Sequence, residues 1–291
     1  MISSKKVLKI ITGSYLFLFF GYLFLPLIFM GIVAFNSSSL PQVSPWEGFT
    51  WHWFHELSQD SRMWDALTNS LIVGVSVVCI SVPIGLAAAL LLTRLQLKSR
   101  DLLYALFVSP ILTPGIILGI STFLFWDRAF AVMGGLWTAI VAQSTFISAY
   151  CMLLIMSRIQ RFDRTQEEAA FDLGASHQQV FFKVTLPFLK PALFSSVALA
   201  FMQSFENYNT TLFAIGFEQT LPIYIGTKLR QFISPAMNAL AVIFIVLTIL
   251  GALIYEYRRM MERRKEAERK KQAKALKKAM AVQPVPAMQG A

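Results

Sequence analysis

The sequence that decides the fold is EAAFDLGASHQQVFFKVTLP, which runs from Glu168 to Pro187. This polar and charged stretch lies between apolar segments that are long enough to cross a membrane. Thr165, followed three residues later by Glu168, has the spacing of a capping box and predicts that a short helix begins there. Gly174 would end that helix, because glycine readily adopts the left-handed conformation that follows many helices.

A second short helix is predicted directly after the glycine. Ser176 and Gln179 repeat the capping-box spacing, so this helix is expected over 177–184. It should end near Pro187, because the residue before a proline avoids the helical region. Two short helices that meet at a glycine cannot bury their own apolar side, so the loop is expected to bind a partner. The alternative is an ordinary linker between two membrane spans.

The composition places the rest of the chain in a membrane. Of its 291 residues, 56% are hydrophobic, 25 are Phe and only 14% are charged, which is typical of a membrane protein. A helix that crosses ~30 Å of hydrocarbon needs about 20 apolar residues. Five uncharged runs meet this length, and a sixth is interrupted by one acid, Glu206. We predict membrane helices near residues 10–35, 67–93, 102–126, 135–157, 191–217 and 236–257.

The predicted fold class is an all-α membrane protein with six transmembrane helices, because a backbone within hydrocarbon must satisfy its own hydrogen bonds. Residues 1–257 are expected to form the transmembrane domain, which contains the loop 158–190. Residues 258–291 are expected to form a basic tail. Four prolines within the predicted spans are expected to kink them: Pro26, Pro83, Pro110 and Pro114.

The basic residues are distributed unequally between the two sides of this arrangement. Of the 26 Lys and Arg residues, three precede the first span, three follow the second, five follow the fourth and eleven lie in the tail. Because cytoplasmic loops carry the excess of basic residues, both termini and the loop 158–190 are predicted to be cytoplasmic. The net charge of +10 then indicates topology and contact of the tail with anionic lipid. Nucleic-acid binding is not expected, since no aromatic residue follows Tyr257.

The remaining reactive side chains predict no chemistry of their own. The apolar run after Lys9 is too long for a cleavable signal peptide and lacks an Ala-x-Ala site, so a retained first span is expected. Cys79 and Cys151 fall within predicted spans and should be buried as small hydrophobic side chains. His52 and His55 lack a third ligand, so neither a metal site nor a cofactor is predicted.

The loop also resembles a sequence hallmark of the membrane subunits of bacterial binding-protein-dependent ABC importers. That hallmark reads Glu-Ala-Ala, three residues, Gly, nine residues and Ile-x-Leu-Pro. The chain has every spacing, with Val184 in place of Ile. The resemblance implies a type I ABC importer permease in the bacterial inner membrane that works by alternating access. It also implies that the loop docks on an ATPase subunit, through Glu167, Glu168, Ala169, Ala170, Asp172, Gly174, Ala175, Leu186 and Pro187.

The same resemblance implies an assembly. Its other members would be a homologous permease subunit, two ATP-binding subunits and an extracytoplasmic substrate-binding protein, within membrane lipid. The chain itself has no Gly-x-x-x-x-Gly-Lys-Ser/Thr loop and no catalytic residue set. It is therefore not expected to be an enzyme, and ATP hydrolysis is expected in a separate subunit.

A second resemblance narrows the family to the spermidine/putrescine permease group. It rests on the sequence FNSS from Phe35 to Ser38, on WEGFT from Trp46 to Thr50, and on Asn238-Ala239-Leu240-Ala241. The resemblance implies a polyamine as cargo. The Trp-rich part of this loop is predicted to lie at the membrane interface, with a rim that binds the external protein as the alternative.

Glu206 is the candidate substrate contact, because an ionisable group within a span is costly and usually faces a cavity. Polar residues follow it directly, and the predicted substrate pathway comprises Glu206, Asn207, Tyr208, Asn209 and Thr210. The polyamine group commonly has paired acids here, whereas this chain has Glu206-Asn207. A singly charged amine, a zwitterionic amino compound and a different solute therefore stay open. A further open alternative is that the Glu206 side chain reaches the membrane interface or pairs with another subunit.

A self-sufficient, proton-coupled secondary carrier with Glu206 as its proton site is the alternative function. Six spans are few for a carrier that must contain both inverted repeats. The spacing of the loop 158–190 therefore favours the ATP-driven importer.

Overall fold

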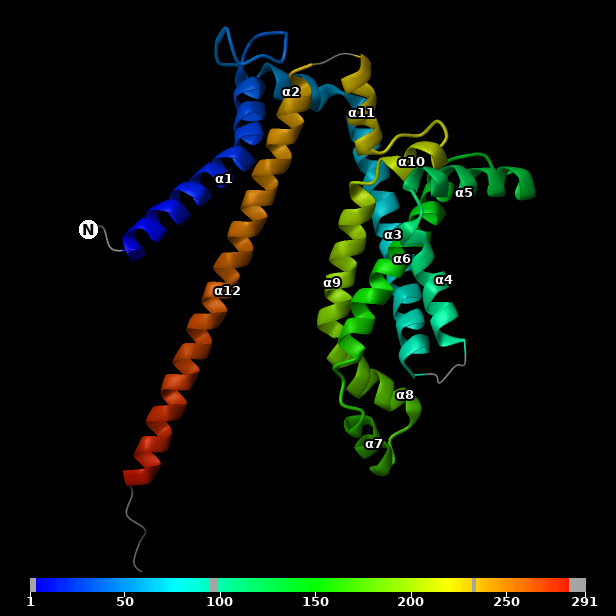
Figure 1. Cartoon of the computed structure of the whole chain (residues 1–291), viewed down its shortest axis with the longest axis vertical. Coiled ribbons are helices and arrows are strands. Elements are labelled where there is room, and N and C mark those ends of the chain that lie inside the picture. The colour runs from blue at the N-terminus through cyan, green and yellow to red at the C-terminus, as the bar shows by residue number, and fades with distance from the viewer. Residues whose placement is uncertain (1–3, 95–98, 232–233, 283–291) are drawn as a thin grey trace, which may run out of the picture. The chain divides into compact units, whose positions relative to one another are not determined.

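The structure is a computed structural model that describes residues 4–94, 99–231 and 234–282. These ranges are helical apart from the irregular loop 36–51, which contains one isolated bridge between Asn36 and Phe49, and shorter connections (Figure 1). The helices are α1 (Ser4–Phe35), α2 (His52–Gln59), α3 (Ser61–Arg94), α4 (Arg100–Leu112), α5 (Gly115–Phe130), α6 (Leu136–Ile159), α7 (Thr165–Asp172), α8 (His177–Val180), the π-helical turn η1 (Phe181–Thr185), α9 (Leu186–Phe205), α10 (Asn209–Ala214), α11 (Leu221–Gln231) and α12 (Ala236–Val282).

The predicted all-α membrane fold is confirmed. Within the described residues, five helical segments are long and apolar enough to cross a membrane, and the bent pair α4 and α5 makes a sixth candidate. The five are Leu8–Phe35, Ser61–Arg94, Leu136–Ile159, His177–Phe205 and Ala236–Glu266. The described part of the tail continues α12 as a helix to Val282.

The chain divides into two compact units, and the first combines residues 1–57 with 234–291. In this unit α1 packs against α12, and Val33 of α1 and Ala239 of α12 are buried. The loop after α1 is held by Trp53, whose indole N–H donates to the backbone carbonyl of Asn36 at 2.7 Å. Four aromatic rings form one cluster beside it: Phe35, Phe49, Trp51 and Phe54.

The second unit, residues 58–233, is built around α3, α6 and α9, which pack side by side (Figure 1). Small residues allow this close approach, as is usual between helices in lipid. A Cβ atom added at Gly85 of α3 would lie 2.5 Å from the Cβ atom of Cys151 on α6. Cys151 is fully buried there, as predicted, whereas Cys79 is exposed on the surface of the chain. The prediction that both cysteines are buried was therefore wrong for Cys79, which lines an apolar pocket between α3 and α9.

Polar contacts also join α3 to α11 within this unit. The carboxylate of Asp60, which directly precedes α3, accepts hydrogen bonds from the Tyr224 hydroxyl at 2.7 Å and from the Lys228 ammonium at 3.0 Å. Burial raises the pKa of Asp60, but these two donors and the positive charge of Lys228 outweigh it, so the pKa lies below its usual value. Further along α3, the Ser70 hydroxyl accepts a hydrogen bond from the backbone N–H of Leu221 at 2.8 Å.

The third predicted span, 102–126, is not one straight helix. It is broken between α4 and α5, whose axes are bent by 103°, so that α5 runs across the direction of α4 in Figure 1. The break lies at Thr113, which is extended with ψ 129°. Thr113 precedes Pro114, and a residue before a proline avoids the helical region. The sequence predicted a kink here but not a change of direction of this size.

The fifth predicted span, 191–217, is wrong at both ends. Its helix begins earlier, because α8, η1 and α9 form one continuous helical segment from His177 to Phe205. The π-helical turn η1 ends two residues before Pro187 and keeps the chain helical where we expected an end, since a locally widened turn accommodates the proline. At the other end α9 stops at Phe205, and a separate short helix, α10, follows after residues 206–208.

Candidate functional site

The first candidate site is the loop 158–190, and its first helix begins differently from the prediction. Thr165 and Glu168 do not form a capping box; Arg164 occupies the cap position without a side-chain hydrogen bond. Instead, the carboxylate of Asp163 accepts a hydrogen bond from the backbone N–H of Thr165 at 3.0 Å. Hydrogen bonds from the side chain and backbone of Thr165 hold the pKa of Asp163 below its usual value. Asp163, one position before the cap, therefore provides the side-chain hydrogen bond at the start of α7 that was expected from Thr165.

The end of α7 and the start of α8 agree with the prediction. Gly174 has φ +82°, the left-handed conformation, and its backbone N–H donates to the Phe171 carbonyl at 2.8 Å. The N–H of Ala175 donates to the Ala170 carbonyl at 3.0 Å, which completes a Schellman motif. Ser176 and Gln179 form the predicted capping box. The two short helices are thus fixed against each other by the glycine turn.

The loop exposes an acidic and apolar surface. Leu173 is 89% exposed and Phe171 is 39% exposed, and Glu168, Ala169 and Asp172 are exposed beside them. A leucine exposed to this degree on an ordered turn lacks the favourable free energy of apolar burial, which binding in an apolar cleft of a partner would provide. Of the other predicted docking residues, Gly174 is exposed, whereas Ala170 and Ala175 are half-buried. Leu186 is half-buried and Pro187 is exposed, and both begin α9 instead of lying on the short helices.

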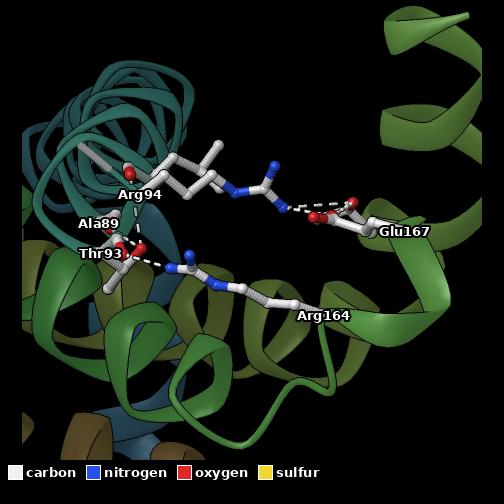
Figure 2. A network of polar contacts seen from close by, with 7 residues as sticks. Ala89, Thr93, Arg94, Arg164 and Glu167 are labelled. Atoms are coloured by element: carbon white, nitrogen blue, oxygen red, sulfur yellow. Dashed lines mark hydrogen bonds and ion pairs between the residues drawn. The ribbon is translucent and has the colours of Figure 1, made fainter. Parts of the chain in front are cut away.

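Glu167 lies differently from Glu168, although the sequence grouped the two acids together. Its side chain is only 12% exposed, and its carboxylate lies 2.5 Å from the guanidinium of Arg94 at the end of α3 (Figure 2). It also accepts a hydrogen bond from the hydroxyl of Thr185 in η1. Sequence reasoning missed Arg94 and Thr185, because they lie 73 and 18 positions away from Glu167.

The second candidate site is a polar cavity of about 340 Å³ in the second unit. Two interruptions of helical structure meet in its wall, the bend between α4 and α5 and the break between α9 and α10. Glu206 is exposed to it and is the one charged side chain among its described lining residues. The lining comprises Pro110, Ile111, Thr113, Gly115, Leu118, Phe146, Tyr150, Gln203, Glu206, Asn207, Tyr208, Asn209 and Thr210. All five predicted pathway residues are therefore brought together there.

A buried hydrogen-bond network holds the break between α9 and α10. The Asn207 amide oxygen accepts from the backbone N–H of Thr211 at 3.1 Å and from its hydroxyl at 2.9 Å. The Thr211 hydroxyl in turn accepts from the fully buried amide of Gln143 on α6 at 2.7 Å. The hydroxyl of Ser204 donates to the other end of that amide at 2.5 Å. Asn207 thus also stabilises the wall, and Gln143 is a residue that the sequence analysis missed.

Close approach between α5 and α10 shapes the same cavity. A Cβ atom added at Gly115 would lie 2.7 Å from the Thr210 hydroxyl oxygen, and one at Gly119 would overlap the Thr210 carbonyl oxygen. Glycine at these two positions lets α5 pack directly on α10. In the sequence alone, Gly115 and Gly119 gave no indication of this contact.

Comparisons with known proteins agree with this architecture. A family model described as binding-protein-dependent transport system inner membrane component matches residues 81–259. The putrescine transport system permease protein PotI of Escherichia coli strain K12 is 33% identical over 237 residues, which cover 79% of this chain and 84% of that protein. The spermidine/putrescine transport system permease protein PotC of Haemophilus influenzae is 28% identical over 243 residues, covering 82% of this chain and 92% of that protein.

Solved structures share the fold. A chain of a bacterial ABC transporter involved in the import of the acidic polysaccharide alginate superposes with a TM-score of 0.71 at 17% identity, covering 88% of this chain and 98% of that chain. A chain of the MetNI methionine ABC transporter in an inward-facing conformation gives a TM-score of 0.51 at 20% identity, covering 69% of this chain and 94% of that chain. At these identities the likeness concerns the fold alone.

The family match covers more than half of the chain, and it includes the glycine turn of the loop 158–190 and both sides of the polar cavity. The hallmark spacing around Gly174 lies within the matched residues. The chain therefore belongs to the family of binding-protein-dependent transport system inner membrane components, as a multi-pass inner-membrane permease subunit of an ABC transporter.

Proposed function

We propose that this permease subunit imports a polyamine or a related amine, by alternating access driven by separate ATPase subunits. The choice of cargo rests on the cavity of about 340 Å³. Among the described residues that line it, Glu206 is the one with a charged side chain. The names of the relatives, which concern putrescine and spermidine, support the same choice.

The chemistry of the cavity suits a small cation. A single carboxylate attracts an ammonium group, and the aromatic rings of Phe146, Tyr150 and Tyr208 lie in the same lining. Aromatic faces attract cations, by about 0.5–2 kcal/mol for each well-placed contact. A volume of this size is typical of small-molecule sites. One carboxylate matches one ammonium group, so the second charge of a diamine would be met by another subunit or by water.

Its proposed partners are a homologous permease subunit, two ATP-binding subunits and an extracytoplasmic substrate-binding protein, all surrounded by membrane lipid. The loop that exposes Glu168, Leu173 and Gly174 supports the contact with an ATPase subunit. In α1, the apolar side chains from Leu8 to Phe29 are exposed, which supports contact of this helix with lipid or with the second permease. The proposed transmembrane domain is residues 1–257, and the proposed basic cytoplasmic tail is residues 258–291.

We further propose that both termini and the loop 158–190 are cytoplasmic. A cysteine introduced at Gln59 in a Cys79→Ser, Cys151→Ala background should then react with an impermeant thiol reagent from outside, while one at Gln178 should react only after permeabilisation. The physical basis is the excess of Lys and Arg on one side. Labelling in the opposite sense would overturn the orientation, and labelling of both sites from outside would overturn the number of spans between them.

Uptake into proteoliposomes that contain the complete complex tests the proposed function. With ATP inside and the loaded binding protein outside, we expect uptake of labelled putrescine that excess unlabelled spermidine inhibits and an excess of a dicarboxylate of similar length does not. Uptake that follows a proton gradient and continues without ATPase subunits would identify the chain as a secondary carrier instead. ATP-driven uptake of an anionic or uncharged solute alone would retain the importer and overturn the amine.

A further inference from the structure

Three elements of the permease converge on one carboxylate. Arg94 ends α3, Glu167 lies in the first turn of α7 and Thr185 ends the π-helical turn η1. The Arg94 guanidinium lies 2.5 Å from the Glu167 carboxylate and donates to the Thr185 hydroxyl oxygen at 3.3 Å. The Thr185 hydroxyl, which is buried, donates to the same carboxylate oxygen of Glu167. The donors and the acceptor therefore form a closed triangle.

A second contact joins the same two helices, one turn away. The guanidinium of Arg164 donates to the backbone carbonyl of Thr93 at 2.7 Å (Figure 2). Carbonyl groups in the last turn of a helix lack partners within the helix, so this arginine satisfies an acceptor that α3 leaves free. In Figure 2 the side chains of Arg94 and Arg164 bridge the space between the two helices roughly in parallel. Helix α7 is thus attached to the end of α3 at two points, and not only through the chain that leads into it.

The two adjacent acids of α7 face different environments. Successive residues of a helix point about 100° apart, so one of a neighbouring pair can face the protein while the other faces outward. Glu167 is 12% exposed and paired, whereas Glu168 is exposed. The Arg94 side chain of this pair is 36% exposed, but two additional hydrogen bonds through Thr185 hold the two charged groups in one geometry.

We propose that Arg94, Glu167 and Thr185 form an internal strut that passes movement of α7 to α3 and α9. Glu167 is then a positioning residue that does not contact the ATPase subunit, whereas Glu168 does. This rests on the proposed function, in which an ATPase subunit moves the loop. Helix α3 packs along α6 and α9. It is hydrogen-bonded to α11 through Asp60, which directly precedes it, and through Ser70 in its N-terminal third. A displacement received at Arg94 would therefore reach both ends of the second unit.

Charge exchange in the complete complex tests the strut. Arg94→Glu and Glu167→Arg, each alone, should retain the ATPase subunits during purification and hydrolyse ATP. The amount of amine imported per ATP should fall about five-fold, because a partly exposed ion pair is worth about 1 kcal/mol. The double variant Arg94→Glu with Glu167→Arg should recover most of the loss. Thr185→Val, which keeps the shape of the side chain, should give a smaller loss of amine imported per ATP. Because this variant changes no charge, it still tests the strut if a reversed charge prevents insertion of the other variants.

The matched control is Glu168→Arg, the same change one position along the helix. It should weaken retention of the ATPase subunits, and Arg94→Glu should not restore it. If Glu167→Arg loses the ATPase subunits as Glu168→Arg does, Glu167 is a docking residue and the strut is overturned while the proposed function stands. Unchanged import per ATP in Glu167→Arg and Thr185→Val also overturns the strut. If Glu168→Arg too leaves coupled uptake unchanged, the proposed coupling role of the loop fails as well.

Discussion

Glu206→Gln is expected to weaken the uptake of a cationic amine about five- to thirty-fold, measured as the concentration of half-maximal ATP-driven uptake in proteoliposomes. The glutamine keeps the shape and hydrogen bonding of the side chain but loses its charge. In a cavity with partial access of water, the lost attraction is about 1–2 kcal/mol at an effective dielectric constant near 20. Uptake by the variant should also depend less on external salt, because screening acts on charges.

Two variants separate this effect from damage to the fold. Glu206→Asp retains the charge at the end of α9 and should lose less than Glu206→Gln. Glu218→Gln makes the same chemical change at an exposed acid outside the cavity lining, and it should leave the half-maximal concentration within a factor of about two. If Glu206→Gln transports the amine as well as the unchanged chain does, Glu206 does not contact the cargo. The amine proposal then loses the observation that carries it.

Gly174→Val is expected to abolish most ATP-driven uptake while the spans still insert. At φ +82° a residue with a Cβ atom is disfavoured by about 1–2 kcal/mol, and a β-branched residue more so. A Cβ atom at Gly174 would meet nothing within 4 Å, so the effect would come from the backbone turn and not from a clash. A changed turn would alter the orientation of α7 relative to α8 and disrupt the exposed surface around Leu173. We expect at least a ten-fold loss of ATPase stimulation by the loaded binding protein.

Gly174→Asn is the control, because asparagine tolerates the left-handed conformation better than other residues with a side chain. It should retain a large part of the coupled uptake. Glu168→Lys should resemble Gly174→Val for a different reason, since a like-charge contact with a basic group of the partner costs several kcal/mol. Normal stimulation and normal uptake in both Gly174→Val and Glu168→Lys would exclude the loop 158–190 as the contact with the ATPase.

The local features of this protein could be predicted from the sequence. The membrane helices follow from the lengths of apolar runs, because in hydrocarbon a long apolar segment must be helical. The turn between α7 and α8 follows from Gly174 and from the Ser176 cap, which act on backbone groups within three residues. The break before Pro114 was also readable as a kink. Each of these depends on interactions within a few residues along the chain.

Tertiary structure decided the features that join distant segments. The interruption after Phe205 contains neither glycine nor proline, and it is held by the hydrogen bonds that link Asn207 to Gln143 on α6. The different surroundings of Glu167 and Glu168 depend on Arg94, which lies 73 positions before Glu167. The hallmark includes Glu168 and not Glu167, but its spacing does not indicate that Glu167 is shielded and paired with Arg94. The sequence by itself thus determined most of the membrane helices, the turn at Gly174 and the capping box at Ser176. Packing of α3, α6 and α9 determined which acid faces outward and where the polar cavity lies, since burial and pairing arise only once the helices are in contact.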